Sequence, residues 1–278
     1  MTTVSGGLRK MQASLPADQN DVVRYQMVLD DHRLELNEYL GESIHLEYAG
    51  AINCVHCGRK TNKSFNQGYC YPCFKSLAQC DVCIMSPEKC HYDAGTCREP
   101  EWGEEFCMQD HYVYLANSSG LKVGITRGTQ IPTRWIDQGA VQALPIYRVG
   151  TRQCAGLVEV IFKQHMADKT NWRAMLKGNP ELLDLAAVVQ QLTPEVADEI
   201  GVLQDRFGLQ AIQACEAAEA VQINFPVAEF PVKISSLNFD KTPLVEGKLL
   251  GIKGQYLMLD SGVINMRKFG GYQISFSA

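Results

Sequence analysis

The stretch from Cys54 to Cys73 reads CVHCGRKTNKSFNQGYCYPC, with cysteines at positions 54, 57, 70 and 73. Each C-x-x-C pair forms a tight knuckle that offers two thiolates to one ion, and the loop between the pairs lets them complete a tetrahedron. Gly58 and Gly68 lie where this backbone must turn sharply. The spacing predicts a structural zinc site formed by Cys54, Cys57, Cys70 and Cys73. Redox-active pairs, or buried cysteines used as small hydrophobic side chains, are the alternatives.

A second group of cysteines follows at Cys80, Cys83, Cys90, Cys97 and Cys107. With His91, it offers enough ligands for a second zinc ion and one to spare. We favour Cys80, Cys83, Cys90 and Cys97, and Cys107 in place of Cys97 is the main variant. Both sites would be closed and structural, so the metal would supply folding free energy in a stretch poor in core residues. Cys154 and Cys215 are predicted to be ordinary buried thiols.

Nine of the eleven cysteines in this chain of 278 residues therefore lie within one stretch. The first residues lack the apolar segment of a secretory signal, and no apolar run approaches the ~20 residues that span a bilayer. We therefore expect a cytoplasmic protein without a membrane partner. Thiols stay reduced in that compartment, which favours metal binding over disulfides. A hydrophobic fraction of 46% and a charged fraction of 21% are typical of a globular chain.

Charge is distributed unevenly along the chain. The formal net charge of −5 excludes a uniformly basic surface. Residues 111–178 nevertheless hold nine basic and three acidic side chains, whereas residues 179–224 hold one and eight. The basic segment favours a phosphate-rich ligand, because contacts to backbone phosphates dominate affinity for nucleic acids.

The pattern along the chain predicts an α+β fold. The expected parts are a β-rich N-terminal part (1–52), a cysteine-rich zinc module (53–110), a small α/β core (111–178), an acidic helical segment (179–224) and a β-rich C-terminal part (225–278). Each β-rich part is short for a stable barrel, so the two are candidates for folding together.

Within the core, residues 111–115 and 121–125 are predicted strands, with Asn117-Ser118-Ser119-Gly120 as the hairpin turn. Residues 153–166 have a helical pattern. In the acidic segment, Asn179-Pro180 and Thr193-Pro194 predict two helix starts, because each places a capping residue before proline.

The order of motifs in the core resembles that of the GIY-YIG nuclease superfamily. Tyr112-Val113-Tyr114 stands in place of Gly-Ile-Tyr, and Lys122-Val123-Gly124 in place of Tyr-Ile-Gly. An arginine, a glutamate and an asparagine follow at Arg134, Glu159 and Asn171. The departures are Tyr112 for glycine and Lys122 for tyrosine, which is typical of a variant branch. The likeness covers about residues 111–175. The whole chain also resembles an uncharacterised bacterial family, domain of unknown function 2797, which names no activity.

The resemblance implies a small α/β domain and a divalent-metal-dependent endonuclease. Glu159 would hold one Mg²⁺ or Mn²⁺, a hard cation that prefers carboxylate and water. Arg134 would clamp the phosphate through its planar guanidinium group. Tyr114 or Tyr112 would orient or deprotonate water, and Lys122 would neutralise developing charge. Asn171 matches the asparagine that ends the family's series.

Six further basic residues are expected to contact nucleic acid: Arg127, Arg148, Arg152, Lys163, Lys169 and Arg173. The motif residues also have ordinary structural explanations: the tyrosines as half-buried strand residues, Glu159 as a solvated helix residue and Asn171 as a helix cap. The alternatives to an endonuclease are therefore a non-catalytic RNA- or DNA-binding module and a protein-interaction scaffold built on zinc. The sequence leaves open DNA against RNA, sequence preference and oligomeric state.

Overall fold

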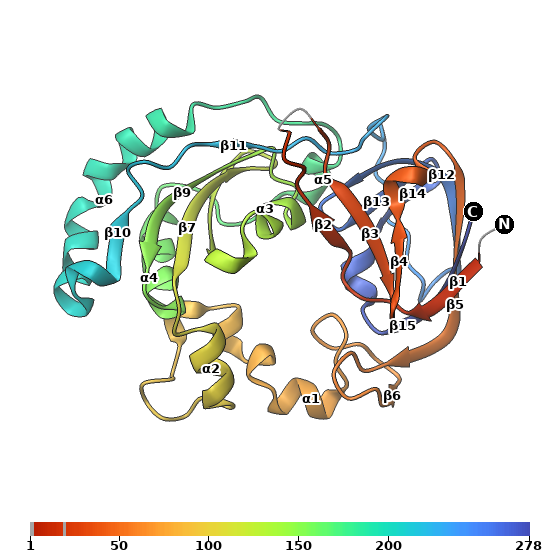
Figure 1. Ribbon diagram of the computed structural model, residues 1–278, viewed down its shortest axis with the longest axis horizontal. Coiled ribbons are helices and arrows are strands. Elements are labelled where there is room, and N and C mark those ends of the chain that lie inside the picture. The colour runs from red at the N-terminus through yellow and green to blue at the C-terminus, as the bar shows by residue number, and fades with distance from the viewer. Residues whose placement is uncertain (1–2, 19–20) are drawn as a thin grey trace.

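The computed structural model describes residues 3–18 and 21–278, and it has an α+β fold built on three antiparallel sheets (Figure 1). The largest sheet joins strands from both ends of the chain in the order β1-β15-β5-β12-β13-β14, and β6 pairs with β5. Its strands are β1 (Thr3–Gly7), β5 (Ser43–Asn53), β6 (Lys60–Thr61), β12 (Leu244–Lys253), β13 (Tyr256–Leu259), β14 (Gly262–Asn265) and β15 (Tyr272–Ser277).

A three-stranded sheet covers this large sheet. It consists of β2 (Gln12–Ser14), β3 (Arg24–Leu29) and β4 (His32–Glu35). Alternate apolar residues of the two sheets, such as Met27, Leu46 and Ile274, are buried in one hydrophobic core. This alternation arises because successive strand side chains point to opposite faces.

The β-rich part contains the same series of elements twice. Strands β3 and β4 lead into a 3₁₀ helix, η1 (Leu36–Tyr39), and then into β5. Strands β13 and β14 likewise lead into η7 (Met266–Phe269) and then into β15. The last strands of the two series pair with each other, with Ile274 opposite Tyr48. Neither half of the sheet is therefore completed without the other end of the chain.

The other large sheet holds the residues of the predicted core. Its strand order is β10-β9-β7-β8, with β11 also pairing with β9. The strands are β7 (His111–Asn117), β8 (Leu121–Arg127), β9 (Gln142–Val149), β10 (Ile212–Ala214) and β11 (Val221–Gln222). Residues 117–120 link β7 to β8 as expected, and Tyr114 lies opposite Gly124.

Helices lie on both faces of this sheet. Val113 and Leu115 face α4 (Arg152–Phe162) and its hydrophobic cluster. Tyr114 and Ala116 belong to the opposite cluster, which contains Trp135 from α3 (Thr133–Asp137) and extends into the β-rich part. The sheet thus fixes α3 and α4 on opposite sides of the β7–β8 hairpin.

The acidic segment differs from the expected two helices. A single helix, α6 (Leu185–Phe207), contains Pro194 in its interior, and residues 209–224 return to the sheet as β10 and β11. The helix continues through Pro194 because Val196 and Ile200, beyond it, are buried against the α4 cluster. An interior proline removes one backbone hydrogen bond and bends the helix locally, whereas the packing free energy comes from residues along the whole helix.

The predicted helix start at Asn179-Pro180 is also wrong. Residues 179–184 have no regular secondary structure, because side chains of the core sheet bind their backbone. Asn117 donates to the carbonyl of Glu181 (2.8 Å), and Gln142 both donates to and accepts from the backbone of Leu183. Asp184 then caps α6 by accepting a hydrogen bond from the backbone N–H of Ala187.

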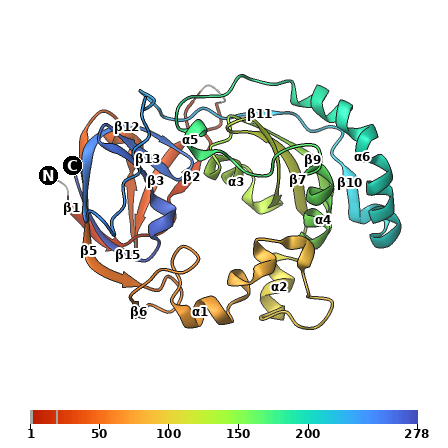
Figure 2. The same ribbon diagram turned by 180° about the vertical axis from the view of Figure 1, so that it is seen from behind.

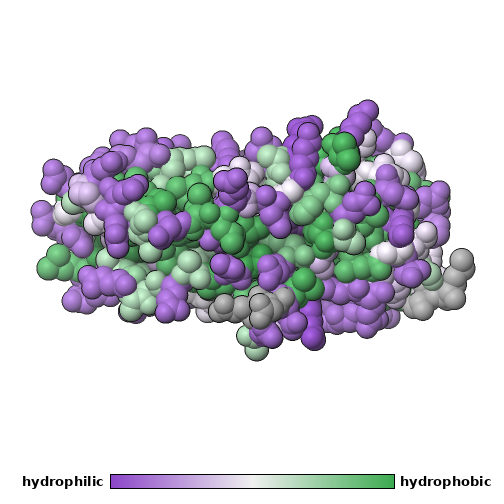
Figure 3. Space-filling model, turned by 90° about the horizontal axis from the view of Figure 1, so that it is seen from above, coloured by the Kyte–Doolittle hydropathy of each residue, from purple (hydrophilic) through white to green (hydrophobic). Residues whose placement is uncertain are grey.

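The cysteine-rich segment runs between the β-rich part and the core sheet, with α1 (Tyr71–Ser76) and α2 (Pro100–Phe106) along its path (Figures 1 and 2). Another short helix, α5 (Trp172–Met175), lies near the end of the core segment. Viewed from above, the molecule is wider than it is thick, and hydrophilic residues cover much of its outline (Figure 3). Within residues 3–18 and 21–278, none of the helices has the length and apolar character to cross a membrane.

Candidate functional site

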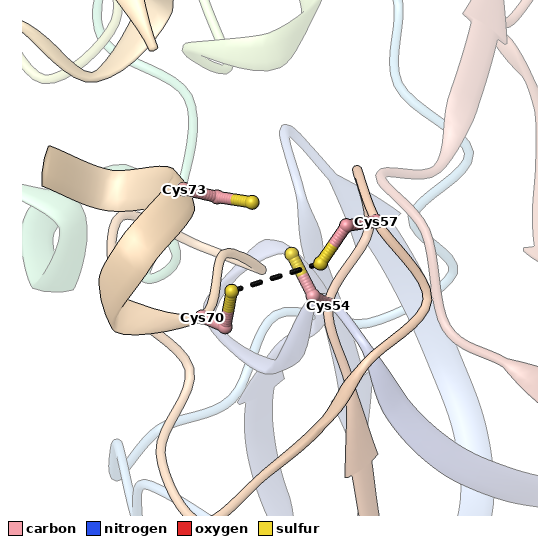
Figure 4. A group of neighbouring side chains, drawn as sticks. All are labelled: Cys54, Cys57, Cys70 and Cys73. Carbon is pink, nitrogen blue, oxygen red and sulfur yellow. Dashed lines mark hydrogen bonds between the residues drawn. The ribbon is translucent and has the colours of Figure 1, made fainter. Parts of the chain in front are cut away.

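The four cysteines of the first group converge on one point (Figure 4). Cys54 and Cys57 lie in the turn after β5, and Cys70 and Cys73 lie at the start of α1. All four sulfur atoms are within 4.8 Å of one another, and those of Cys57 and Cys70 are 3.7 Å apart. A tetrahedral zinc ion with Zn–S bonds of about 2.3 Å needs sulfurs about 3.8 Å apart. The cluster is therefore compatible with a structural zinc site.

Backbone groups around this cluster stabilise a thiolate. Burial alone would raise the pKa of Cys54, but backbone N–H groups of Cys57, Cys70 and His56 lower it to about 6. Gly68 has a φ of +143° and lies against Val55, where a Cβ would be 2.5 Å from a methyl carbon. A side chain at this glycine would push the loop between the two knuckles away from the cluster.

The second group of cysteines does not assemble as expected. Cys80 is buried in the same hydrophobic cluster as Cys54, Cys70 and Cys73. The other four, including Cys107, line a different, small cavity: Cys83, Cys90, Cys97 and Cys107. The structure therefore does not bring Cys80 together with Cys83, Cys90 and Cys97, the other members of the expected ligand set, because Cys80 packs in the first cluster.

A basic depression of about 440 Å³ lies between the core sheet, the cysteine-rich segment and the β-rich part. It shares Lys10, Arg134 and Arg267 with a neighbouring depression of about 540 Å³, so the two form one continuous surface. In the part of the chain that the structure describes, the first depression is lined by seven basic and three acidic side chains, which are Lys10, Arg127, Arg134, Arg152, Lys163, Lys169, Arg267, Asp137, Glu159 and Asp168.

Helix α4 and the loop after it place two carboxylates at this depression. Glu159 is on α4, and its side chain is only 12% exposed. The amino group of Lys163 lies 3.1 Å from Glu159 and 3.4 Å from Asp168. Burial raises the pKa of Glu159, while Lys163 opposes that rise. Asp168 is held in place because the backbone N–H of Val123 donates to the carbonyl of Ala167 (3.0 Å).

Lys122 and Tyr114 lie beneath the depression. Burial and the neighbouring Arg134 lower the pKa of Lys122 to about 8. Tyr114 has no exposed surface; it donates to Gln138 (3.2 Å) and packs over Gly124. Burial raises the pKa of Tyr114, and the adjacent guanidinium of Arg134 counteracts this. Tyr114 is thus a neutral side chain that interacts with the guanidinium of Arg134.

Besides the buried Tyr114 and Lys122, four other sequence-derived residues are absent from the described lining of the depression. Tyr112 packs against Gly128 on the sheet. Asn171 caps α5 by accepting from the N–H of Ala174 (3.2 Å). Arg148 binds Asp110 through two nitrogens, and Arg173 stacks on Trp172 at 4.4 Å.

Two charged residues from outside the core segment and one from within it line the depression but were missed by the sequence reasoning. They are Lys10 near the N-terminus, Asp137 at the end of α3 and Arg267 of η7. Asp137 accepts ion pairs from both Lys10 and Arg267. Arg267 is the second residue of η7, and the equivalent residue of η1 is Asn37. Asn37 accepts a hydrogen bond from the backbone N–H of Tyr25 in β3. Counting charges segment by segment cannot predict that charged residues so far apart in the sequence lie together in the folded protein.

The structure thus defines an α+β protein with a four-thiol cluster and a basic depression beside it. Its sequence matches a family model described as "Protein of unknown function (DUF2797)" over residues 41–274, and the chain belongs to that family. The comparison with curated proteins gave no match, and the comparison with solved structures gave none either.

Proposed function

We propose that the protein is a zinc-stabilised, nucleic-acid-acting protein and that the basic depression is a divalent-metal-dependent endonuclease site of GIY-YIG type. The observation that carries this proposal is the meeting of Arg134 and Glu159 at one depression, although they come from helices on opposite faces of the β7–β8 hairpin. Lys122, the residue that begins the second motif, is buried beneath them.

The substrate is a polymer of phosphates. Seven cations around one depression, with only three carboxylates among the described lining residues, favour an anionic ligand. Each phosphate contact releases condensed counterions, so such a surface gives salt-dependent affinity. Arg127, Arg152, Lys163 and Lys169 are the expected nucleic-acid contacts that line it, and Lys10 and Arg267 extend it toward the β-rich part. Arg148 and Arg173, which have their own partners, are expected to contribute least.

Glu159 and Asp168 would hold the Mg²⁺ or Mn²⁺, because carboxylates are the ligands that these hard cations prefer. A bound divalent ion supplies Lewis acidity at the phosphate and activates water. Arg134 holds the phosphate in a bidentate contact. Tyr114 is a positioning residue for Arg134, and Lys122 keeps positive potential under the phosphate. Neither Tyr112 nor Asn171 has a place in this scheme.

Zinc at Cys54, Cys57, Cys70 and Cys73 has a structural role in the proposal. The four thiols fill the coordination of the ion, so no position is open for a substrate. The cluster fixes the segment that leads from the β-rich part to the core sheet. Zinc there keeps the two sides of the depression together.

The experiment is a cleavage assay on single- and double-stranded DNA and RNA with Mg²⁺ or Mn²⁺. Glu159→Gln and Arg134→Lys should each reduce cleavage at least a hundredfold. The matched controls are Glu199→Gln and Arg148→Lys, and both should keep wild-type rates. In the wild-type protein Glu199 accepts a hydrogen bond from Gln164 on the surface, and Arg148 pairs with Asp110. Cleavage that survives Glu159→Gln would overturn the mechanism.

A non-catalytic RNA- or DNA-binding module is the second candidate. Lys163 already forms ion pairs with both Glu159 and Asp168, which favours nucleic-acid binding by the remaining cations alone. Salt-dependent binding without cleavage under every metal condition would support this candidate over the endonuclease. If the protein binds neither RNA nor DNA even at low salt, the result would favour a protein-interaction scaffold built on zinc.

A further inference from the structure

We propose a second zinc site, formed by Cys83, Cys90, Cys97 and Cys107, that is separate from the four-thiol cluster at Cys54–Cys73. This inference is independent of the proposed nuclease activity. It rests on a small cavity that these four side chains line together.

The size of the cavity suits one ion. Its volume is about 20 Å³, whereas a single water-sized sphere needs roughly 10–15 Å³. The four thiols supply the donor type and number of a closed, tetrahedral site, and their side chains would close up around the ion, because the four sulfurs do not all lie within 4.8 Å of one another. The stretch that supplies them is core-poor, since the thiols are linked by turns, the 3₁₀ helices η3 (Val82–Ile84) and η4 (Pro87–Lys89), and the short helix α2.

Asp81 and His91 lie beside the same cavity, and together with Cys83 they have ligand atoms within 4.8 Å of one another. Both are already engaged. Asp81 accepts from the backbone of Val82 and binds Arg98 at 2.6 Å. His91 bonds Thr96 through Nδ1 (2.8 Å) and faces Asp81 through Nε2. We therefore assign the pair to the wall of the site and the four thiols to the metal.

Charge around the cavity favours an anionic centre. Four thiolates and one Zn²⁺ carry a net charge of −2. Arg152 and Arg127 both interact electrostatically with Cys107. Arg152 donates to the carbonyl of Ile84 (2.8 Å), its buried Nε lacks a hydrogen-bond partner, and it has no ion pair with a carboxylate in residues 3–18 and 21–278. Arg152 is half-buried, and a cation withdrawn from water in this way is stabilised by a nearby negative charge.

The site is fixed to the helix that carries Glu159. Gly156 of α4 lies so close to η4 that a Cβ would be 2.6 Å from the side chain of Pro87. Gln153 of the same helix donates to the carbonyl of Cys90 (3.1 Å). Zinc bound here would therefore hold the cysteine-rich segment against α4, next to the basic depression.

Zinc content of the purified full-length protein tests the assignment. Wild-type protein should contain two zinc ions per chain, and Cys107→Ser should contain one. The matched control is Cys80→Ser, which removes the thiol that the sequence pattern favours and should retain two ions. One zinc in the wild type, or loss of one in Cys80→Ser with none lost in Cys107→Ser, would overturn the proposal.

X-ray absorption of wild-type zinc protein identifies the ligands without any variant, so a misfolded variant does not decide the outcome. Sulfur-only coordination, with Zn–S distances of about 2.3 Å and two zinc ions per chain, is the expected result. A shell of nitrogen or oxygen at about 2.0–2.1 Å would place His91 or Asp81 on the metal and contradict the four-thiol set.

Discussion

The amino group of Lys163 lies 3.1 Å from the carboxylate of Glu159, one turn away on helix α4. The same amino group is 3.4 Å from Asp168 on the next loop. One lysine thus bridges the two carboxylates that would hold a divalent ion in the proposed site. A metal and Lys163 would compete for the same oxygen atoms, and this competition can be measured.

Lys163→Met should tighten Mn²⁺ binding at high pH, because it removes the competing cation. Burial already raises the pKa of Glu159, and Lys163 opposes that rise. The pKa of Glu159 should therefore increase further in the variant, and the midpoint of Mn²⁺ binding should move to higher pH by up to about one unit. Calorimetric titration with Mn²⁺ across pH 4–8 measures both effects, with Lys169→Met as the control. A midpoint that stays in place would refute the coupling.

Lys169→Ala should weaken nucleic-acid binding, whereas Arg173→Ala should not. Both side chains are exposed and basic and lie four residues apart, but only Lys169 lines the depression. Loss of one phosphate contact should reduce the slope of log affinity against log salt by about 0.7–0.9. Binding measured by fluorescence anisotropy at several salt concentrations gives this slope. Equal effects of the two substitutions would argue against the depression as the binding surface.

Cys57→Ser should cost the protein one zinc ion and several degrees of melting temperature. Its sulfur is part of the cluster within 4.8 Å, and a structural zinc ion contributes directly to folding free energy. Elemental analysis and thermal unfolding measure the two effects. Cys215→Ser, which removes a thiol outside the cysteine-rich segment, should leave the zinc content unchanged. Full zinc retention in Cys57→Ser would contradict the site.

Lys122→Met should stabilise the protein near neutral pH. Lys122 is 4% exposed, and burial followed by the charge of Arg134 lowers its pKa from 10.5 to about 8. Between these values the unfolded chain binds more protons than the folded one, so wild-type stability should increase as pH rises from about 8 to 10.5. The full effect is at most about 3 kcal/mol.

Chemical unfolding at pH 7.5 and at pH 10 measures this dependence. The advantage of Lys122→Met over the wild type should be largest at pH 7.5 and should shrink at pH 10. Lys169→Met, at an exposed position, should follow the wild-type curve. An advantage that is the same at both pH values would show that Lys122 carries no buried charge.

The sequence by itself determined the local features whose causes lie within a few residues. The spacing of Cys54, Cys57, Cys70 and Cys73 predicted a shared point, because each knuckle presents two thiols and one loop joins the knuckles, and the structure brings all four together. The hairpin at residues 117–120 and the α+β class followed from turn residues and alternation. These features depend on short-range geometry, which residue order encodes directly.

Tertiary structure decided the features that depend on distant packing. Cys80 lies with the first cluster and Cys107 with the second cavity, because the turn at Asp81 directs neighbouring thiols to opposite sides. Helix α6 runs through Pro194 because its buried face packs on α4. Lys10 and Arg267 reach the depression because the ends of the chain share one sheet. Residue spacing cannot encode such contacts, since the free energy that fixes them comes from surfaces far apart in the chain.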